Sequence, residues 1–295
     1  MSLIAAHNRC ALTADVAHLQ RLGELPDAKY WSQVNPIGRT FPQVEGVVGP
    51  PKCAIMLHSV CDPHTKGEAA YYTSPRRFHE LMRWFRESGY STATTAQWLR
   101  DEVPANHVLL TFDDGYDDLY EHLLPLVIEH HYTPIVYLVA DHIGGSNVWD
   151  QASGLRARNL LTVEQIREMQ NYGVEFGSHT LSHPRLSKVS DEQLHHEVTD
   201  SKHRIEDLLG VEAASFAYPF GDIDGRVRNA VAGAGYKLAF TVEPGLNRRN
   251  DLFRQRRAEV NDSTTVSDFK FTLRRGLGPR QFFNPRHFLK SVRNW

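Results

Sequence analysis

The sequence contains few cysteines and no long apolar segment. Its three cysteines, Cys10, Cys53 and Cys61, form no CxxC pair and no even-numbered set, so we expect neither a disulfide framework nor a cysteine-based metal site. The apolar run at residues 135–140 is far shorter than the roughly 20 residues that cross a bilayer. The composition therefore excludes a membrane-spanning protein.

The chain also lacks an excess of charge of either sign. It has 33 Lys and Arg against 35 Asp and Glu, a net charge of −2 with neutral histidines. Such a chain has no overall field to attract phosphates, so we expect no nucleic-acid partner. Its 295 residues, 41% of them hydrophobic, are enough to bury a sizeable core in one large domain or two small ones.

The N-terminus lacks the apolar core of a secretory signal. Residues 1–20 include His7, Arg9, Asp15 and His18, which an apolar signal core would not contain. We therefore expect a cytoplasmic protein, unless a leader has been removed. Proline and glycine punctuate residues 1–50 so densely that we expect an irregular arm there, with at most one helix over 11–22.

From residue 53 onward, short apolar runs alternate with amphipathic stretches. Strands are expected over 53–58, 108–112, 135–139, 174–176, 215–218 and 238–242. Helices are expected over 75–88, 119–129, 162–171, 191–209 and 226–234. This alternation predicts an α/β fold with parallel strands covered by helices. No GxGxxG or GxxxxGK[ST] loop follows a strand, and a (β/α) barrel fits better than a doubly wound sheet.

Side chains with catalytic potential follow these strands. In a (β/α) barrel the chemistry collects at the carboxyl ends of the strands. There the sequence has His58, the acidic pair Asp113 and Asp114, the segment 177–179 and the segment 218–221. We therefore expect carboxylates and histidines at one rim of the barrel.

The two strongest motifs are TFDDG at residues 111–115 and HTLSHP at 179–184. Adjacent carboxylates on an extended segment point in opposite directions, so the acidic pair has two different tasks or is only a capped turn. Imidazoles four residues apart lie on one face of a helical turn and can reach one ion. One carboxylate and two imidazoles form a metal site with open positions, which leaves the second carboxylate to accept a proton.

The motifs at 111–115, 179–184 and 216–221, in this order and spacing, resemble those of the NodB-homology polysaccharide deacetylases, carbohydrate esterase family four. The resemblance covers about residues 53–260. It implies a distorted (β/α) barrel, of seven strands, and metal-dependent removal of acetyl groups from N-acetylated sugars.

The resemblance also implies roles for single residues. Asp113 corresponds to the general base, and Asp114, His179 and His183 correspond to the ligands of a divalent metal. The metal is expected to be Zn²⁺, with Co²⁺, Ni²⁺ or Mn²⁺ as alternatives. The backbone N–H of Phe220 corresponds to a donor that stabilises the oxyanion.

The chain departs from the family pattern in two places. Many members carry an arginine where this chain has Ala217, and we expect Arg257, or else Arg256, to replace it. Many members also end with a strand that supplies a histidine as general acid, and nothing after residue 260 matches that strand. The segment 55–59 instead resembles the circularly permuted branch that includes the poly-β-1,6-N-acetylglucosamine deacetylases. His58 is then the expected acid, unless it is only a structural histidine at a strand end.

The sequence thus predicts a carbohydrate N-deacetylase acting on a polysaccharide, an oligosaccharide or a carrier-linked amino sugar. Two alternatives stay open, a cyclic amide or ureide hydrolase and a carbohydrate-binding protein with an impaired site. We expect a catalytic domain over 51–262, followed by a basic, aromatic extension over 263–295 that packs on it. Trp149, at the same rim, either stacks on a sugar or anchors its loop.

Overall fold

A computed structural model describes residues 51–248 and 251–279 of the chain. The N-terminal arm predicted over 1–50, with its helix at 11–22, lies outside the described residues, as do residues 280–295 of the C-terminal extension. The domain boundaries derived from the sequence stay predictions.

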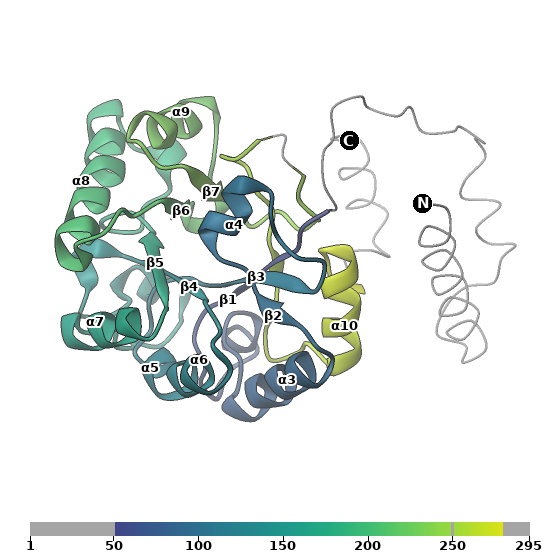
Figure 1. The fold of residues 1–295 in the computed structure, drawn as a ribbon. Coiled ribbons are helices and arrows are strands. Elements are labelled where there is room, and N and C mark those ends of the chain that lie inside the picture. The colour runs from purple at the N-terminus through teal and green to yellow at the C-terminus, as the bar shows by residue number, and fades with distance from the viewer. Residues whose placement is uncertain (1–50, 249–250, 280–295) are drawn as a thin grey trace, which may run out of the picture. The chain divides into compact units, whose positions relative to one another are not determined.

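The described residues form one curled, parallel sheet with most of its helices around its outer side (Figure 1). Seven strands follow one another in the order β7-β6-β5-β4-β3-β1-β8, and β2 pairs with the start of β3 outside this row. The strands are β1 (Ala54–Leu57), β2 (Ser91–Thr92), β3 (His107–Phe112), β4 (Ile135–Leu138), β5 (Glu175–Ser178), β6 (Ser215–Ala217), β7 (Leu238–Phe240) and β8 (Ala258–Glu259). The six strands predicted from apolar runs are all present.

The segment before β8 links the two ends of the sheet. The N–H of Thr241 donates to the carbonyl of Gln255 (2.8 Å), and the N–H of Gln255 donates to the carbonyl of Ala239 (3.0 Å), beside β7. A few residues later β8 pairs with β1, and the N–H of Val260 donates to the carbonyl of Met56 (2.9 Å). One segment therefore crosses from β7 to β1 and curls the sheet into the predicted distorted (β/α) barrel.

Eight α-helices are present in the described part of the chain. They are α3 (Pro75–Glu87), α4 (Thr95–Arg100), α5 (Asp118–His122), α6 (Leu124–His130), α7 (Val163–Asn171), α8 (Asp191–Leu209), α9 (Gly225–Gly233) and α10 (Val266–Arg275). The single helix predicted over 119–129 was wrong, because Pro125 has no N–H to continue the helix and stands at the start of α6. None of these helices has the length and apolar character needed to span a bilayer.

Side chains of the strands alternate between two cores. One cluster, under the covering helices, contains Ile55, Leu110 and Val136. The other lies on the opposite face of the same strands and contains Ala54, Leu109 and residues from β4, β6 and β7. The interior of the barrel is therefore filled by side chains, and chemistry is confined to the rim where the strands end.

We predict that Gly177→Ala destabilises the barrel by about 1–3 kcal/mol, the usual cost of overpacking a core. A Cβ at this position of β5 would lie 2.5 Å from Cε1 of Tyr137 and 2.7 Å from the carbonyl oxygen of Ser215. The free energy of unfolding in urea measures the effect. Gly233→Ala in α9 is the control, because a Cβ there meets nothing within 4 Å. Equal stability of Gly177→Ala and wild type would contradict the close approach of β5 to its neighbours.

Candidate active site

The two carboxylates that follow β3 have different partners, as the sequence predicts. The N–H of Asp113 donates to the carbonyl of Leu57 (2.9 Å) and so continues the pairing of β3 with β1. Asp114 then turns into the left-handed region, with a φ of 73°. Both side chains are buried. The turn sends one carboxylate to Arg257 and the other to the histidines.

Arg257 forms a bidentate ion pair with Asp113. Its two terminal nitrogens lie 2.6 and 2.8 Å from Oδ1 and Oδ2 of the carboxylate, and neither residue reaches solvent. The guanidinium also donates to Oγ1 of Thr111 (3.1 Å) and to the carbonyl of Thr241 (3.1 Å). Burial raises the pKa of Asp113, but the charge and hydrogen bonds of Arg257, together with the nearby His179 and His58, outweigh it, and the pKa falls to about 2. Asp113 is therefore a fixed carboxylate at neutral pH.

The structure brings Arg257, and not Arg256, to the acidic pair. Arg256 points toward the loop of Gly245 and is only partly buried. Adjacent residues of the closing segment face opposite sides of the sheet, so only one of the two arginines can enter the barrel. The guanidinium of Arg257 lies 5.6 Å from the ring centroid of Tyr137 and 5.8 Å from that of Phe240.

His179 and His183 lie in a loop, so the prediction of a helical turn was wrong. The strand β5 ends at Ser178, and Thr180 and His183 adopt left-handed conformations, with φ of 72° and 64°. A residue before proline avoids the α-helical region, which explains why no turn of helix forms at His183 before Pro184. The loop still directs both imidazoles to one place, with 3.2 Å between their Nε2 atoms.

Asp114, His179 and His183 form a group that could hold a metal ion. Oδ1 of Asp114 lies 3.6 Å from Nε2 of His179 and 3.4 Å from Nε2 of His183. The Nδ1 of His179 lies 2.7 Å from the carbonyl of Ala217 and donates its hydrogen there, which leaves the Nε2 lone pair free. Burial lowers the pKa of both histidines.

A cation fits this group better than any internal contact does. Oδ1 of Asp114 is buried without a hydrogen-bond partner, and burial raises the pKa of this carboxyl well above its usual value. Each neutral imidazole offers one nitrogen lone pair and the carboxylate offers oxygen lone pairs, so a cation can be held by all three side chains at once. Their donor set, two nitrogens and one oxygen, is one that divalent metals prefer.

Glu197 of α8 fixes the loop that carries the two histidines. Its Oε2 accepts hydrogen bonds from the N–H groups of Leu181 (2.9 Å) and Ser182 (3.0 Å). From the other side, the N–H of Ala140 donates to the carbonyl of Thr180 (3.0 Å). These bonds satisfy the polar backbone of a loop that is buried and strained.

His58 stands at the end of β1, on the same rim. It is half-buried, and its ring lies 5.8 Å from that of Tyr71 in an edge-to-face arrangement. Burial lowers its pKa, and the carboxylate of Asp113 acts in the opposite direction. The Nδ1 atom of His58 has no hydrogen-bond partner.

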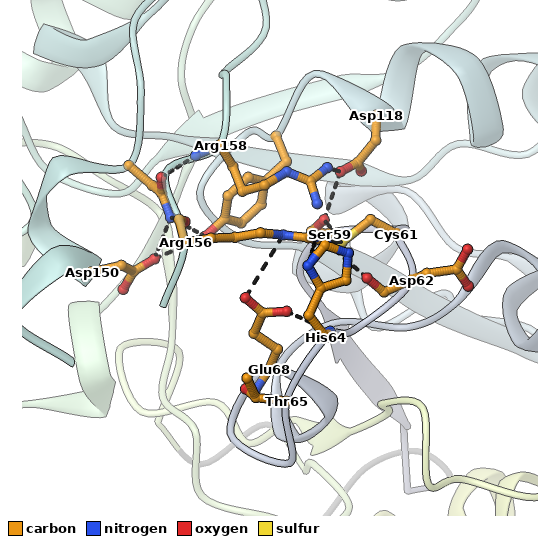
Figure 2. A network of polar contacts seen from close by, with 12 residues as sticks. Ser59, Cys61, Asp62, His64, Thr65, Glu68, Asp118, Asp150, Arg156 and Arg158 are labelled. Carbon is orange, nitrogen blue, oxygen red and sulfur yellow. Dashed lines mark hydrogen bonds and ion pairs between the residues drawn. The ribbon is translucent and has the colours of Figure 1, made fainter. Parts of the chain in front are cut away.

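Asp118 of α5 holds the chain directly after His58 (Figure 2). Its carboxylate accepts from Oγ of Ser59 (2.6 Å) and from the N–H of Val60 (2.8 Å), and it pairs with Arg158 (2.6 Å). Arg156, on the same loop as Arg158, donates to the carbonyl of Asp62 (2.8 Å). The loops after β1 and β4 are thereby joined into one wall of the site.

Two aromatic rings contact His183. The ring of Trp149 stacks on it with 4.8 Å between the ring centroids, and the ring of Phe220 meets it edge to face at 4.7 Å. Trp149 is half-buried, whereas Phe220 is 41% exposed and has a left-handed φ of 58°. Trp149 therefore supports the imidazole and anchors its loop, which favours the second of the two interpretations of this residue.

Sequence reasoning missed Glu197 and Asp118. Glu197 lies among the buried residues of α8, beside Leu194 and Val198, and a carboxylate on the apolar face of a helix was a usable signal. No comparable pattern marked Asp118, because its partners Ser59 and Arg158 are far from it in the sequence.

Comparisons with known proteins agree with this description. Residues 100–239 match the family model for polysaccharide deacetylase, a stretch that contains both acidic residues and both histidines but not His58 or Arg257. YxkH of Bacillus subtilis (strain 168) is 27% identical over 200 residues, 66% of this chain and 67% of that protein. The poly-beta-1,6-N-acetyl-D-glucosamine N-deacetylase of Staphylococcus epidermidis is 23% identical, over 59% of this chain. The match spans 62% of that relative's length.

Two solved structures share the fold. The Streptococcus pyogenes deacetylase PplD superposes with a TM-score of 0.65 at 24% identity, over 76% of this chain and 99% of that one. IcaB from Ammonifex degensii gives a TM-score of 0.63 at 21% identity, over 77% and 97% of the two chains. These similarities identify the same distorted barrel.

We predict that Arg257→Met lowers the free energy of unfolding at pH 7 by about 3–5 kcal/mol, because it leaves the carboxylate of Asp113 buried without a partner. Urea denaturation measures the loss, and Arg256→Met is the matched control. The difference from wild type should shrink as the pH falls from 7 to 4. In the variant the pKa of Asp113 rises, so this carboxyl becomes neutral at a higher pH than in wild type. Wild type keeps its full stabilisation from Asp113 above about pH 4 and loses it only as the pH falls toward 2. A difference that does not depend on pH would assign the loss to packing alone.

Proposed function

We propose that this chain, which belongs to the polysaccharide deacetylase family, is a metal-dependent hydrolase that removes N-acetyl groups from an amino-sugar-containing carbohydrate. One observation carries the proposal. A group of three metal-binding side chains lies beside a second carboxylate, Asp113, which Arg257 holds in its ionised form. A metal site beside an ionised carboxylate is one arrangement that hydrolyses an amide by activated water.

We assign the metal to Asp114, His179 and His183, and we propose zinc. Two imidazoles and a carboxylate, with remaining positions open, form the ligand set of catalytic zinc sites. Bound there, a divalent metal would polarise the acetyl carbonyl and lower the pKa of a water molecule from 15.7 toward about 7. The hydrogen bond from His179 to the carbonyl of Ala217 keeps the ligand nitrogen unprotonated.

Asp113 acts as the general base in this proposal. Both of its oxygens accept from Arg257, which fixes the orientation of the carboxylate, and each oxygen keeps a second lone pair that can accept a proton. It accepts a proton from water, and the hydroxide that results attacks the carbonyl carbon of the acetyl group. Arg257 thereby orients the base from within the barrel.

His58 and Phe220 complete the reaction. The backbone N–H of Phe220 donates to the oxyanion that forms on the former carbonyl oxygen. Protonated His58 then gives its proton to the amide nitrogen, the C–N bond breaks, and acetate and a free amine leave. Asp118 supports this step, because it holds the two residues that follow His58.

The Asp113–Arg257 pair favours an enzyme over the other functions considered from the sequence. A binding protein with an impaired site was considered because the chain has Ala217 in place of an arginine and no C-terminal histidine motif. Arg257 supplies a guanidinium at the base. A cyclic amide hydrolase needs a small closed pocket. Tyr71 and Phe220 are instead 47% and 41% exposed at the rim, which suits a bulkier carbohydrate.

We predict that acetate release from N-acetylated oligosaccharides stops when a chelator removes the metal and returns with added Zn²⁺. Asp113→Asn should abolish turnover and still bind zinc, because the three ligands remain. His183→Ala should lose both activity and zinc, because only two ligands remain. Acetate assays and metal analysis of the purified variants give the two measurements.

His196→Ala is the control for the histidine variant, because His196 is an exposed residue of α8 outside the site. Full turnover by Asp113→Asn would remove the proposed base. Activity that survives complete removal of the metal would exclude the metal mechanism.

We predict that His58→Gln lowers kcat by about 10²–10⁴-fold, the usual contribution of a general acid. A general acid works in its protonated form, so wild-type kcat falls as the pH rises through the pKa of this histidine. Because burial lowers that pKa, the fall begins at a lower pH than for an exposed histidine. The variant should lose this limb of the pH–rate profile. A profile of unchanged shape would argue against His58 as the acid.

A further inference from the structure

We propose that Arg185 forms a binding subsite for an anionic group of the carbohydrate, a carboxylate or a phosphate on or beside the sugar that carries the acetyl group. The inference rests on the proposed function, because it assigns a substrate class to the same site. The residue follows His183 by two positions and is exposed.

The guanidinium of Arg185 lies over the ring of Phe220, 4.3 Å from its centroid. The other neighbour of this ring is His183, with 4.7 Å between the two ring centroids. A single aromatic ring therefore separates the arginine from one of the metal-binding histidines. If the acetyl group of a sugar reaches the metal site, substituents on or beside that sugar would lie about one aromatic ring away from His183, where Arg185 lies.

The contact with the Phe220 ring leaves the N–H groups of Arg185 available to an anion. A guanidinium over an aromatic face is attracted to the ring and still keeps its N–H donors for other partners. This planar fork matches the two oxygens of a carboxylate or a phosphate. Arg185 is thus held in place for an anion without using the groups that would bind it.

The carboxylates on neighbouring segments are engaged elsewhere. Asp222 accepts from the N–H and the hydroxyl of Ser187 (2.8 and 3.0 Å), and Asp191 pairs with Arg226 (2.8 Å). Glu197 binds the backbone of the histidine loop. Within residues 51–248 and 251–279, no carboxylate forms an ion pair with the Arg185 guanidinium.

Other arginines around the site are already neutralised. Arg158 pairs with Asp118 at 2.6 Å, and Arg156 lies 3.7 Å from Glu68 in the same polar network (Figure 2). Arg204 pairs with Asp141, and Arg257 pairs with the catalytic carboxylate. Among the residues that the structure describes, Arg185 has no ion pair, so an incoming anionic substrate can use it without breaking one.

The test compares a neutral N-acetylated oligosaccharide with two acidic counterparts. One counterpart carries a carboxylate and the other a phosphate, and both are otherwise identical to the neutral one. Arg185→Ala should raise KM for the acidic substrates about 10- to 100-fold, the range of a hydrogen bond to a charged group. The ratio of KM for acidic to KM for neutral substrate is the readout, together with its loss at high salt. Arg185→Lys should recover part of the effect, because it keeps the charge and loses the fork.

Arg83→Ala, which removes an exposed arginine from α3, controls for the change in net charge. If Arg185→Ala raises KM equally for both kinds of substrate, or if wild type acts on the neutral substrate only, the anionic subsite is overturned. Acetate release from neither substrate by zinc-loaded wild type would instead overturn the proposed function. A larger effect on the carboxylate or on the phosphate version identifies the anion.

Discussion

The ion pair between Asp113 and Arg257 connects the fold to the chemistry. Asp113 directly follows β3, and Arg257 precedes β8 on the segment that crosses from β7 to β1. The pair is buried, so each charge requires the other. If the barrel opened between β7 and β1, one of the two charges would become exposed to solvent or would stay buried without a partner. The same contact that completes the barrel thus sets the charge and the orientation of the proposed base.

Strain in the backbone is concentrated at the proposed metal site. Of the six non-glycine residues with a left-handed φ in the described part of the chain, four are Asp114, Thr180, His183 and Phe220. Such conformations cost free energy and persist only where the surroundings hold them. Glu197 does so for the histidine loop, and the pairing of Asp113 with β1 does so for Asp114. The strain turns side chains from separate loops toward one point.

The strands and most helices could be predicted because their signals are local. Apolar runs gave β1, β3 and β4, and the amphipathic period gave α8 with the same limits as in the structure. The two-residue strands β2 and β8 carry no such signal, since two residues are too few to show a period. The histidine loop was predicted as a helical turn, because spacing alone does not reveal the left-handed residues that replace the helix.

The site illustrates a further limit of sequence reasoning. Motifs place Asp113, Asp114, His179 and His183 because each pair is adjacent or nearly so, whereas the choice between Arg256 and Arg257 depends on which side of the sheet a residue faces. That side is set by the register of a segment whose pairing with β7 is not visible in the sequence.

The register of this segment allows Arg257 to enter the same interior that the side chain at position 217 faces. The methyl of Ala217 belongs to the same interior cluster as Tyr137 and Phe240, and these two rings also contact the guanidinium of Arg257. An arginine from either position would enter one shared interior. The barrel therefore needs a guanidinium at Asp113 but does not fix the strand that supplies it, because a closed sheet presents the same interior to all its strands. The function of the site is then preserved by the position of a charge in space, and a motif search that requires one sequence position would miss it.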